Sequence, residues 1–149
     1  MAKTTVKAQA HLQDNYRVEV SARSHKLIID EPERLGGTDE GPNPVEVLLG
    51  AFGACHSIVA RTYAKKFDID LQGFWVELEG DFDTDGFLGK SDVRPGFSDI
   101  RYTFHLQTTA SDEQVQAFIA YIEAHCPIGD TLANLVNVSL AGYVIEQTV

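Results

Sequence analysis

The sequence predicts a single α+β domain over residues 1–149, in which strands come first, a long apolar helix follows, and further strands and helices complete the chain. Three observations support this class: alternating apolar and polar residues in two separate regions, a nearly continuous apolar stretch at residues 44–64, and helical spacing after Ser111. Because 44% of the 149 residues are apolar, the chain can form one ordinary core and is too short for two domains.

Alternation predicts three strands at the start of the chain. Residues 4–13 and 16–22 flank Asp14 and Asn15, a turn-prone pair, and are expected to form a hairpin. Residues 26–30 (KLIID) have the composition of a third short strand. A long loop rich in glycine and proline then leads to the apolar stretch, and loops of this length are often functional.

The apolar stretch begins with a helix start signal. Asn43 suits the N-cap, Pro44 the first helical position, and Glu46 the position from which a carboxylate reaches back to the cap. We expect a helix over residues 44–66, buried on nearly all sides because its apolar residues cover most of its circumference. A single small sheet covers only one face, so this pattern predicts a second subunit and hence a homodimer.

Several classes of partner are disfavoured by charge and hydropathy. Twelve Lys and Arg residues against 22 Asp and Glu residues give a net charge of −10, which disfavours nucleic acid. Charged or polar residues at 46, 56 and 61 interrupt the apolar stretch, so it lacks the roughly 18–20 uncharged residues of a membrane span. Residues 1–15 contain no apolar run typical of a secretion signal, and we expect a cytoplasmic protein.

The second half of the chain alternates strand and helix patterns. Residues 69–79 and 97–108 are expected to pair as strands across a connection rich in Gly and Asp. Ser111 and Gln114 resemble a capping box at the start of a helix that Pro127 ends or kinks.

The C-terminal region continues with two predicted elements. A short helix is expected over residues 127–134, and the alternation of residues 136–147 predicts a final strand that returns to the sheet.

Cys55 and Cys126 are the two cysteines of the chain. In a reducing cytosol such residues are free thiols or a transient redox pair more often than a structural disulfide, and composition alone favours simple packing. His56 and His125 follow and precede them, which suggests a zinc site. Adjacent helical residues point about 100° apart, however, so convergence on one ion is disfavoured and no metal or other cofactor is expected.

The motifs around these cysteines resemble those of a known family. The matching features are Arg17 in the early strand region, the loop DEPERLGGTDEGPNPVE at residues 30–46, GAFGACHS around Cys55 and HCPIGDTL around Cys126. With these motifs the chain resembles the OsmC/Ohr superfamily of organic hydroperoxide reductases. The resemblance implies an OsmC-like fold, assembled as an intertwined homodimer with active sites between the subunits.

The resemblance also implies a chemistry. It assigns Cys55 as the peroxidatic cysteine, Cys126 as the resolving cysteine, and Arg17 as the cation that holds the thiolate, with Arg23 as the alternative. A thiolate is the reactive form of cysteine, and a nearby cation favours it. The implied activity is a thiol-dependent peroxidase that reduces organic hydroperoxides, is recycled by an external dithiol and requires no cofactor.

The family's catalytic glutamate has no direct counterpart. In the peroxidase branch it directly follows Asn-Pro, whereas here Val45 occupies that position and Glu46 comes next. One helical residue turns a side chain by about 100°, so Glu46 is either a displaced catalytic carboxylate or only the capping partner of Asn43. This departure leaves an alternative function, an OsmC-fold dimer that binds a small apolar or thiol-bearing ligand without efficient peroxidase activity.

Overall fold

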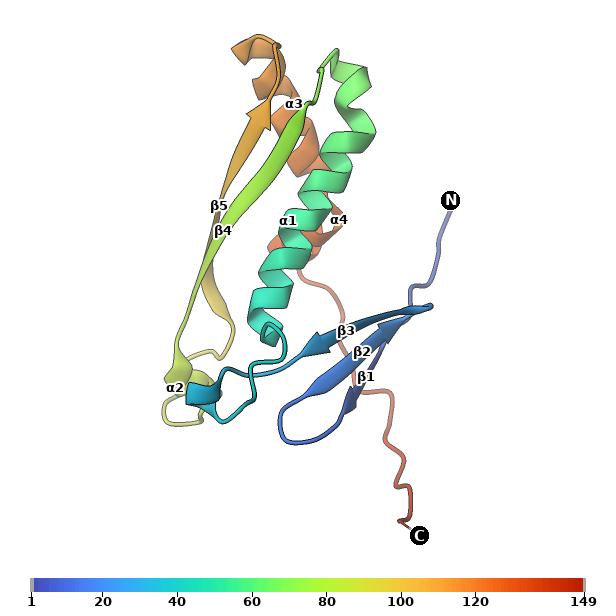
Figure 1. Cartoon of the computed structure of the whole chain (residues 1–149), viewed down its shortest axis with the longest axis vertical. Coiled ribbons are helices and arrows are strands. Elements are labelled where there is room, and N and C mark those ends of the chain that lie inside the picture. Colours follow the sequence, from blue (N-terminus) through green and yellow to red (C-terminus); the bar gives the residue numbers. More distant parts are fainter. Residues whose placement is uncertain (1, 149) are drawn as a thin grey trace.

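The computed structural model describes residues 2–148 as an α+β fold with two small antiparallel sheets. In Figure 1 the N-terminal sheet lies beyond the first turn of the long helix α1, while the second sheet runs alongside that helix. The two C-terminal helices α3 (Asp112–Ala124) and α4 (Pro127–Ala133) lie behind α1 in this view, and both contact it. The C-terminal segment leaves α4 and extends past the N-terminal sheet.

The N-terminal sheet has the strand order β1-β2-β3. It consists of β1 (Gln9–Leu12), β2 (Val18–Ala22) and β3 (His25–Ile29), all antiparallel. Asn15 adopts the left-handed conformation in the first turn, with φ of 55°, which asparagine tolerates better than most residues. The expected hairpin and third strand are confirmed, although β1 is shorter than residues 4–13.

The helix α1 (Pro44–Tyr63) begins with the expected capping box. The side chain of Asn43 accepts a hydrogen bond of 3.0 Å from the Glu46 amide, and the Glu46 carboxylate accepts one of 2.8 Å from the Asn43 amide. Short helix η1 (Glu33–Leu35) lies in the loop before α1, and η2 (Ala64–Phe67) extends α1 at its far end. The predicted helix is therefore confirmed.

The second sheet pairs β4 (Gly73–Phe82) with β5 (Phe97–Gln107), and short helix α2 (Thr84–Phe87) lies in their connection. The pairing is as expected, but β4 begins later than residue 69. Ile69 and Leu71 are buried against the helices instead of joining the ladder, because the chain must first turn back from the end of α1.

The helices α3 (Asp112–Ala124) and α4 (Pro127–Ala133) confirm the remaining helix predictions. The Ser111 hydroxyl accepts a hydrogen bond from the Gln114 amide in the expected capping box. Proline at 127 occupies the first position of α4, where its missing N–H has no cost, and Cys126 becomes the N-cap of that helix.

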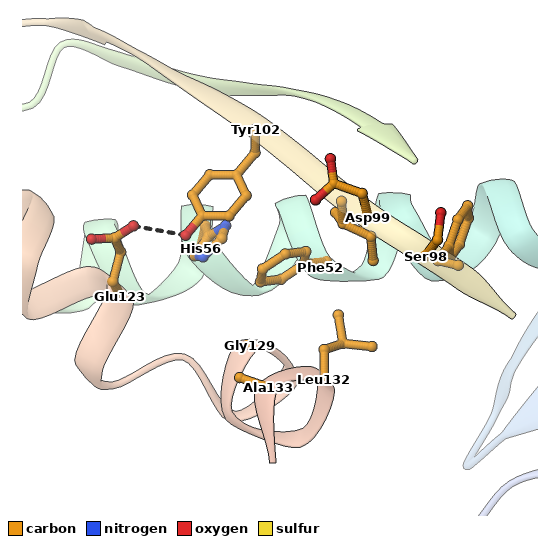
Figure 2. A pocket seen from close by; sticks show the side chains of 11 residues that line it. Phe52, His56, Ser98, Asp99, Tyr102, Glu123, Gly129, Leu132 and Ala133 are labelled. Atoms are coloured by element: carbon orange, nitrogen blue, oxygen red, sulfur yellow. Dashed lines mark hydrogen bonds between the residues drawn. The ribbon is translucent and has the colours of Figure 1, made fainter. Parts of the chain in front are cut away.

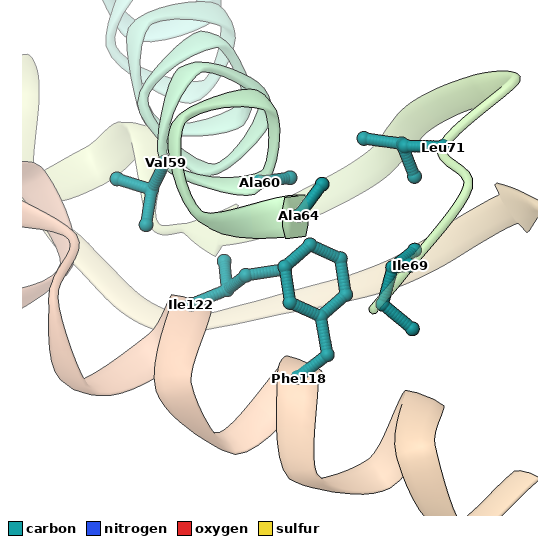
Figure 3. Close-up of a cluster of buried hydrophobic side chains, with 7 residues drawn as sticks. All are labelled: Val59, Ala60, Ala64, Ile69, Leu71, Phe118 and Ile122. Atoms are coloured by element: carbon teal, nitrogen blue, oxygen red, sulfur yellow. The ribbon is translucent and has the colours of Figure 1, made fainter. Parts of the chain in front are cut away.

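The main core lies where α1, α3 and the start of β4 meet (Figure 3). Two α3 side chains, Phe118 and Ile122, are fully buried there. The buried cluster consists of Val59, Ala60, Ala64, Ile69, Leu71, Phe118 and Ile122. This packing fixes the far half of α1 against α3, and thereby places Cys55 relative to the chain that follows α3.

The expectation that α1 is buried on nearly all sides is wrong within one chain. Its buried residues lie on one face, which packs against β4, α3 and α4, whereas Ile58 on the opposite face is 67% exposed. The segment 44–67 is long and apolar enough by composition to span a membrane. Its packing against β4 and α3 instead makes it the central helix of the fold.

The expectation of a final strand at residues 136–147 is also wrong within one chain. The structure shows no strand there, and the segment is exposed. A strand is stable only when its backbone groups pair with a neighbouring edge, and within the described chain this segment pairs with neither sheet. The alternation of apolar and polar residues thus predicted a strand, but it carried no information about which strand would pair with it.

Candidate functional site

Two sulfur atoms meet between α1 and the start of α4. Cys55 lies in the middle of α1 and is half-buried, while Cys126 is the N-cap of α4 and is 1% exposed. The Cys55 thiol is a neighbour of Cys126, close enough to contribute to the raised pKa of that thiol. The Gly129 amide donates a hydrogen bond of 3.3 Å to the Cys126 sulfur. The fold therefore brings together the two cysteines that the sequence singled out.

The environment of Cys126 keeps its thiol protonated. Burial, with a further contribution from the Cys55 thiol, raises the pKa of Cys126 to about 11, although the Gly129 amide acts in the opposite direction. At neutral pH the Cys126 sulfur is thus a neutral thiol held beside Cys55. Such a group condenses with an oxidised neighbour and is a poor first nucleophile.

The arginines are not brought to the sulfur atoms within one chain. The Arg17 guanidinium, just before β2, donates from Nε over 2.6 Å to the carboxylate of Glu40 in the loop that precedes α1. Arg23 lies in the turn between β2 and β3 with φ of 56°. Among residues 2–148 neither side chain makes a hydrogen bond to Cys55 or Cys126, so a contact with the thiolate stays a prediction.

Glu46 is likewise engaged away from the sulfur. Its carboxylate closes the capping box with Asn43, and nine residues separate it from Cys55 along α1, about 13 Å of helix axis. The capping interpretation of Glu46 is confirmed. A contact with Cys55 of the same chain is not formed.

A cleft of about 410 Å³ opens beside the cysteine pair, between β5 and α4 (Figure 2). Phe52 and His56 from α1 lie between these two elements, and Gly129 forms the wall nearest to Cys126. The lining residues are Phe52, His56, Phe97, Ser98, Asp99, Ile100, Tyr102, Glu123, Gly129, Leu132 and Ala133.

Sequence reasoning did not identify this cleft. Its residues come from β5 and three helices, and no local motif links them. The exception is His56, which adjoins Cys55 in the sequence but packs against Tyr102 and Phe104 of β5. A helical projection of residues 44–63 places His56 on the same face as the other buried residues of α1, one residue from Cys55. That position is the one signal in the sequence that could have identified it.

Three polar side chains of the lining, from β5, α3 and α1, give the cleft its electrostatic character. The Tyr102 hydroxyl donates a hydrogen bond of 2.7 Å to Glu123. Burial, with this hydrogen bond, raises the pKa of Tyr102 to about 12. Burial also lowers the pKa of His56, so both Tyr102 and His56 are neutral at pH 7.

The histidines do not form the zinc site considered from the sequence. His125 stacks on Tyr121 and its Nδ1 lies 2.9 Å from the Tyr121 carbonyl oxygen, while His56 faces β5. Within residues 2–148, no group of three or more His, Cys, Asp and Glu side chains is arranged to hold a metal ion.

A central helix between a β-hairpin and two C-terminal helices, with one cysteine contributed by each of two helices, defines a two-cysteine α+β protein. The chain belongs to the OsmC-like protein family, whose model matches residues 37–141. No curated protein matches the sequence.

Solved structures share this fold at low sequence identity. An OsmC-like protein from Mycoplasma pneumoniae superposes with a TM-score of 0.79 at 19% identity, covering 90% of this chain and 91% of the other. An organic hydroperoxide resistance protein OsmC from Legionella pneumophila gives 0.62 at 23% identity, with coverage of 89% and 91%. An organic hydroperoxide resistance protein from Elizabethkingia anophelis gives 0.62 at 18% identity, with coverage of 87% and 88%.

Proposed function

We propose that this protein is a thiol-dependent peroxidase that reduces organic hydroperoxides through Cys55 and Cys126. The observation that carries the proposal is the meeting of the two thiols, because a sulfenic acid formed at one sulfur lies beside the other. Cys55 is the more accessible of the two, which suits the attacking role. Cys126 is buried beside Cys55, a position that suits the second step.

The proposed reaction has three steps. The Cys55 thiolate attacks the peroxide ROOH, so that an S–O bond forms, the O–O bond breaks, and RO⁻ leaves and takes up a proton to become the alcohol ROH. Cys126 then attacks the Cys55 sulfenic acid, forming the disulfide and releasing water. An external dithiol finally reduces the disulfide by thiol–disulfide exchange and is itself oxidised.

The catalytic assembly we propose is a homodimer. Two apolar surfaces of the chain lack cover: the face of α1 that carries Ile58, and the segment 135–148 with its exposed Leu140 and Ile145. A second copy supplies both an edge for the C-terminal segment and a helix face for α1. The second copy also contributes its Arg17 and its Glu46 to the cysteine pair, because within one chain neither side chain contacts the cysteines of that chain.

The proposed cellular setting is the cytoplasm. A two-cysteine cycle requires that the disulfide be reduced again after each turnover, and the cytosol maintains thiols in the reduced state.

Thiol titration tests the proposal directly. Reduced protein treated with one equivalent of cumene hydroperoxide is expected to lose both free thiols and to release cumyl alcohol. In Cys126→Ser, Cys55 is expected to accumulate as sulfenic acid, which a dimedone adduct detects by mass spectrometry. Two thiols that survive excess peroxide unchanged would refute the peroxidase.

One observation favours a second candidate, a dimer that binds a small apolar or thiol-bearing ligand without efficient turnover. The Glu46 carboxylate accepts a hydrogen bond from the backbone amide of Asn43. It is therefore engaged in capping the helix and not in holding the thiolate, which is the role of the family's catalytic carboxylate. Under this alternative Cys126→Ser leaves ligand affinity unchanged and no sulfenic acid accumulates. The same pair of measurements therefore separates the two functions.

A further inference from the structure

One buried polar atom of the cleft has no partner. His56 is 1% exposed, and its Nδ1 makes no hydrogen bond within residues 2–148. The imidazole is surrounded by the rings of Phe52, Tyr102 and Phe104, whose centroids lie 4.4, 4.8 and 4.8 Å from its own. None of these rings is a hydrogen-bond partner of Nδ1. A buried polar atom left unpaired costs free energy, so a ligand that pairs with it gains that energy on binding.

The charges around the cleft select a neutral ligand. The Asp99 carboxylate is paired with Arg101 at 2.8 Å, and the Glu123 carboxylate accepts from the Tyr102 hydroxyl at 2.7 Å. Both carboxylates are thus engaged and require no cation, while they and the net charge of −10 repel an anion. The imidazole of His56 is neutral as well.

The shape and the unpaired atom together define the ligand class. Apolar side chains form much of the wall, including Phe97, Ile100 and Leu132, and about 410 Å³ is a usual size for a small-molecule site. A neutral imidazole nitrogen donates or accepts according to the tautomer, and a hydroxyl group does both. We propose that this cleft binds a neutral organic molecule with an apolar body and a hydroxyl group that pairs with Nδ1 of His56.

Access to this atom involves the ring of Tyr102. The Tyr102 ring lies next to the imidazole, and its hydroxyl is held by Glu123 (Figure 2). Because Nδ1 is covered in the empty cleft, binding requires a neighbouring ring to move, and we expect the Tyr102 ring, which also lines the cleft, to turn aside.

The cleft adjoins the cysteine pair across a thin wall. Gly129 lines the cleft and donates its amide hydrogen to the Cys126 sulfur. A Cβ atom at this position would lie 3.1 Å from the Phe52 ring and 3.5 Å from that sulfur. The alcohol ROH released by peroxide reduction belongs to the ligand class, and this identification of the ligand rests on the proposed function.

The test is a titration of the reduced wild-type protein with two matched probes. Cumyl alcohol and cumene share the same apolar body, and only the alcohol carries a hydroxyl. The alcohol is expected to bind about tenfold more tightly, the size of one net hydrogen bond, and to shift the ¹⁵N resonance of His56 Nδ1. Equal affinities, or a nitrogen resonance that stays unchanged at saturation, would overturn the proposal.

Two variants sharpen the result. His56→Phe keeps a ring in the site and removes the nitrogen, so the preference for the alcohol is expected to vanish while the melting temperature rises; a preference that persists would contradict the proposal. Leu132→Trp fills the cleft from a half-exposed position and is expected to weaken both probes even if His56→Phe does not fold. Unchanged affinity in Leu132→Trp would also contradict it.

The binding measurements do not depend on turnover. If the protein binds cumyl alcohol as expected but leaves cumene hydroperoxide unreduced, the cleft stands and the peroxidase proposal fails. If it reduces the hydroperoxide and does not discriminate the alcohol from cumene, the peroxidase stands and the cleft proposal fails.

Discussion

At the scale of single residues, the two cysteines have different environments. Cys126 is buried at the N-cap of α4 and receives the Gly129 amide, whereas Cys55 is half-buried on α1. The backbone amides at the start of α4 do not outweigh the loss of hydration, since the pKa of Cys126 rises to about 11. The protein therefore holds a protonated thiol next to a more accessible one, an asymmetry that suits two successive roles.

The raised pKa of Cys126 predicts a pH-dependent second step. Its reactive thiolate fraction is small at pH 7 and grows about tenfold for each pH unit until the pH approaches 11. Burial is the larger cause of the shift and persists after Cys55 is oxidised. We expect the rate of disulfide formation, followed by stopped flow after rapid oxidation, to increase steadily between pH 7 and pH 10. A rate independent of pH would show that Cys126 reacts in another form.

At the scale of elements, a carboxylate ties the segment before β4 to the segment after β5. Asp70, just before β4, accepts hydrogen bonds from the Thr108 hydroxyl at 2.7 Å, the Thr109 amide at 2.9 Å and the Gln72 side chain at 3.0 Å. These bonds, that from Thr108 first, hold the pKa of Asp70 well below its usual range. The carboxylate thereby links the end of β5 to the start of β4.

Asp70→Asn is expected to destabilise the protein in a pH-dependent way. A carboxylate whose pKa is lowered by folding contributes stability above its unfolded pKa of about 3.9, and loses it as the pH falls below that value. The variant should therefore be less stable than wild type in urea at pH 7, with a smaller difference at pH 3. Asp68→Asn serves as the control, because no hydrogen bond to its carboxylate is formed among the described residues. A difference that does not change with pH would contradict this role.

The core between α1 and α3 predicts a large effect of one truncation. Phe118 is fully buried among Val59, Ala64 and their neighbours, so Phe118→Ala should lower the free energy of unfolding by about 3–5 kcal/mol. Phe87→Ala is the matched control, because Phe87 is 73% exposed. Equal losses in the two variants, measured by chemical denaturation, would be inconsistent with this core.

The elements that sequence predicted well are those defined by local signals. The capping boxes at Asn43 and Ser111 and the proline at 127 specify helix ends through contacts within a few residues. The start of β4 was predicted too early, because burial of Ile69 against the helices is a tertiary effect. The cleft was missed for the same reason, since His56, Tyr102 and Glu123 come from three separate elements.

At the scale of the whole molecule, the described chain leaves apolar surface without cover. The face of α1 carrying Ile58 is exposed, and so is the segment after α4. The sequence predicted that α1 is enclosed and that residues 136–147 form a strand, and in the proposed homodimer a second copy would provide both the cover and the neighbouring strand. Arg17, which the family resemblance assigned to the thiolate, lies against Glu40 in the single chain, and its contact with Cys55 stays a prediction of the proposed homodimer.

Ile58→Glu separates a dimer from a monomer. In a single chain this side chain is 67% exposed, so a charge there should change monomer stability little, whereas at a helix–helix contact it buries an unpaired carboxylate. We expect wild type to elute with the mass of a dimer in light scattering, and Ile58→Glu to shift it to the monomer. Ala117→Glu, an exposed position on α3, should leave the mass unchanged. A wild-type monomer would refute the assembly.

The uncovered segment after α4 also bears on how the protein is made. Val138, Leu140, Val144 and Ile145 are each more than four-fifths exposed, and such an apolar, unpaired stretch attracts the same stretch of other newly synthesised chains. Aggregation then competes with correct pairing from the moment the chain leaves the ribosome. The yield of native protein should consequently respond to expression temperature and chaperone supply more strongly than the stability of the finished molecule would suggest.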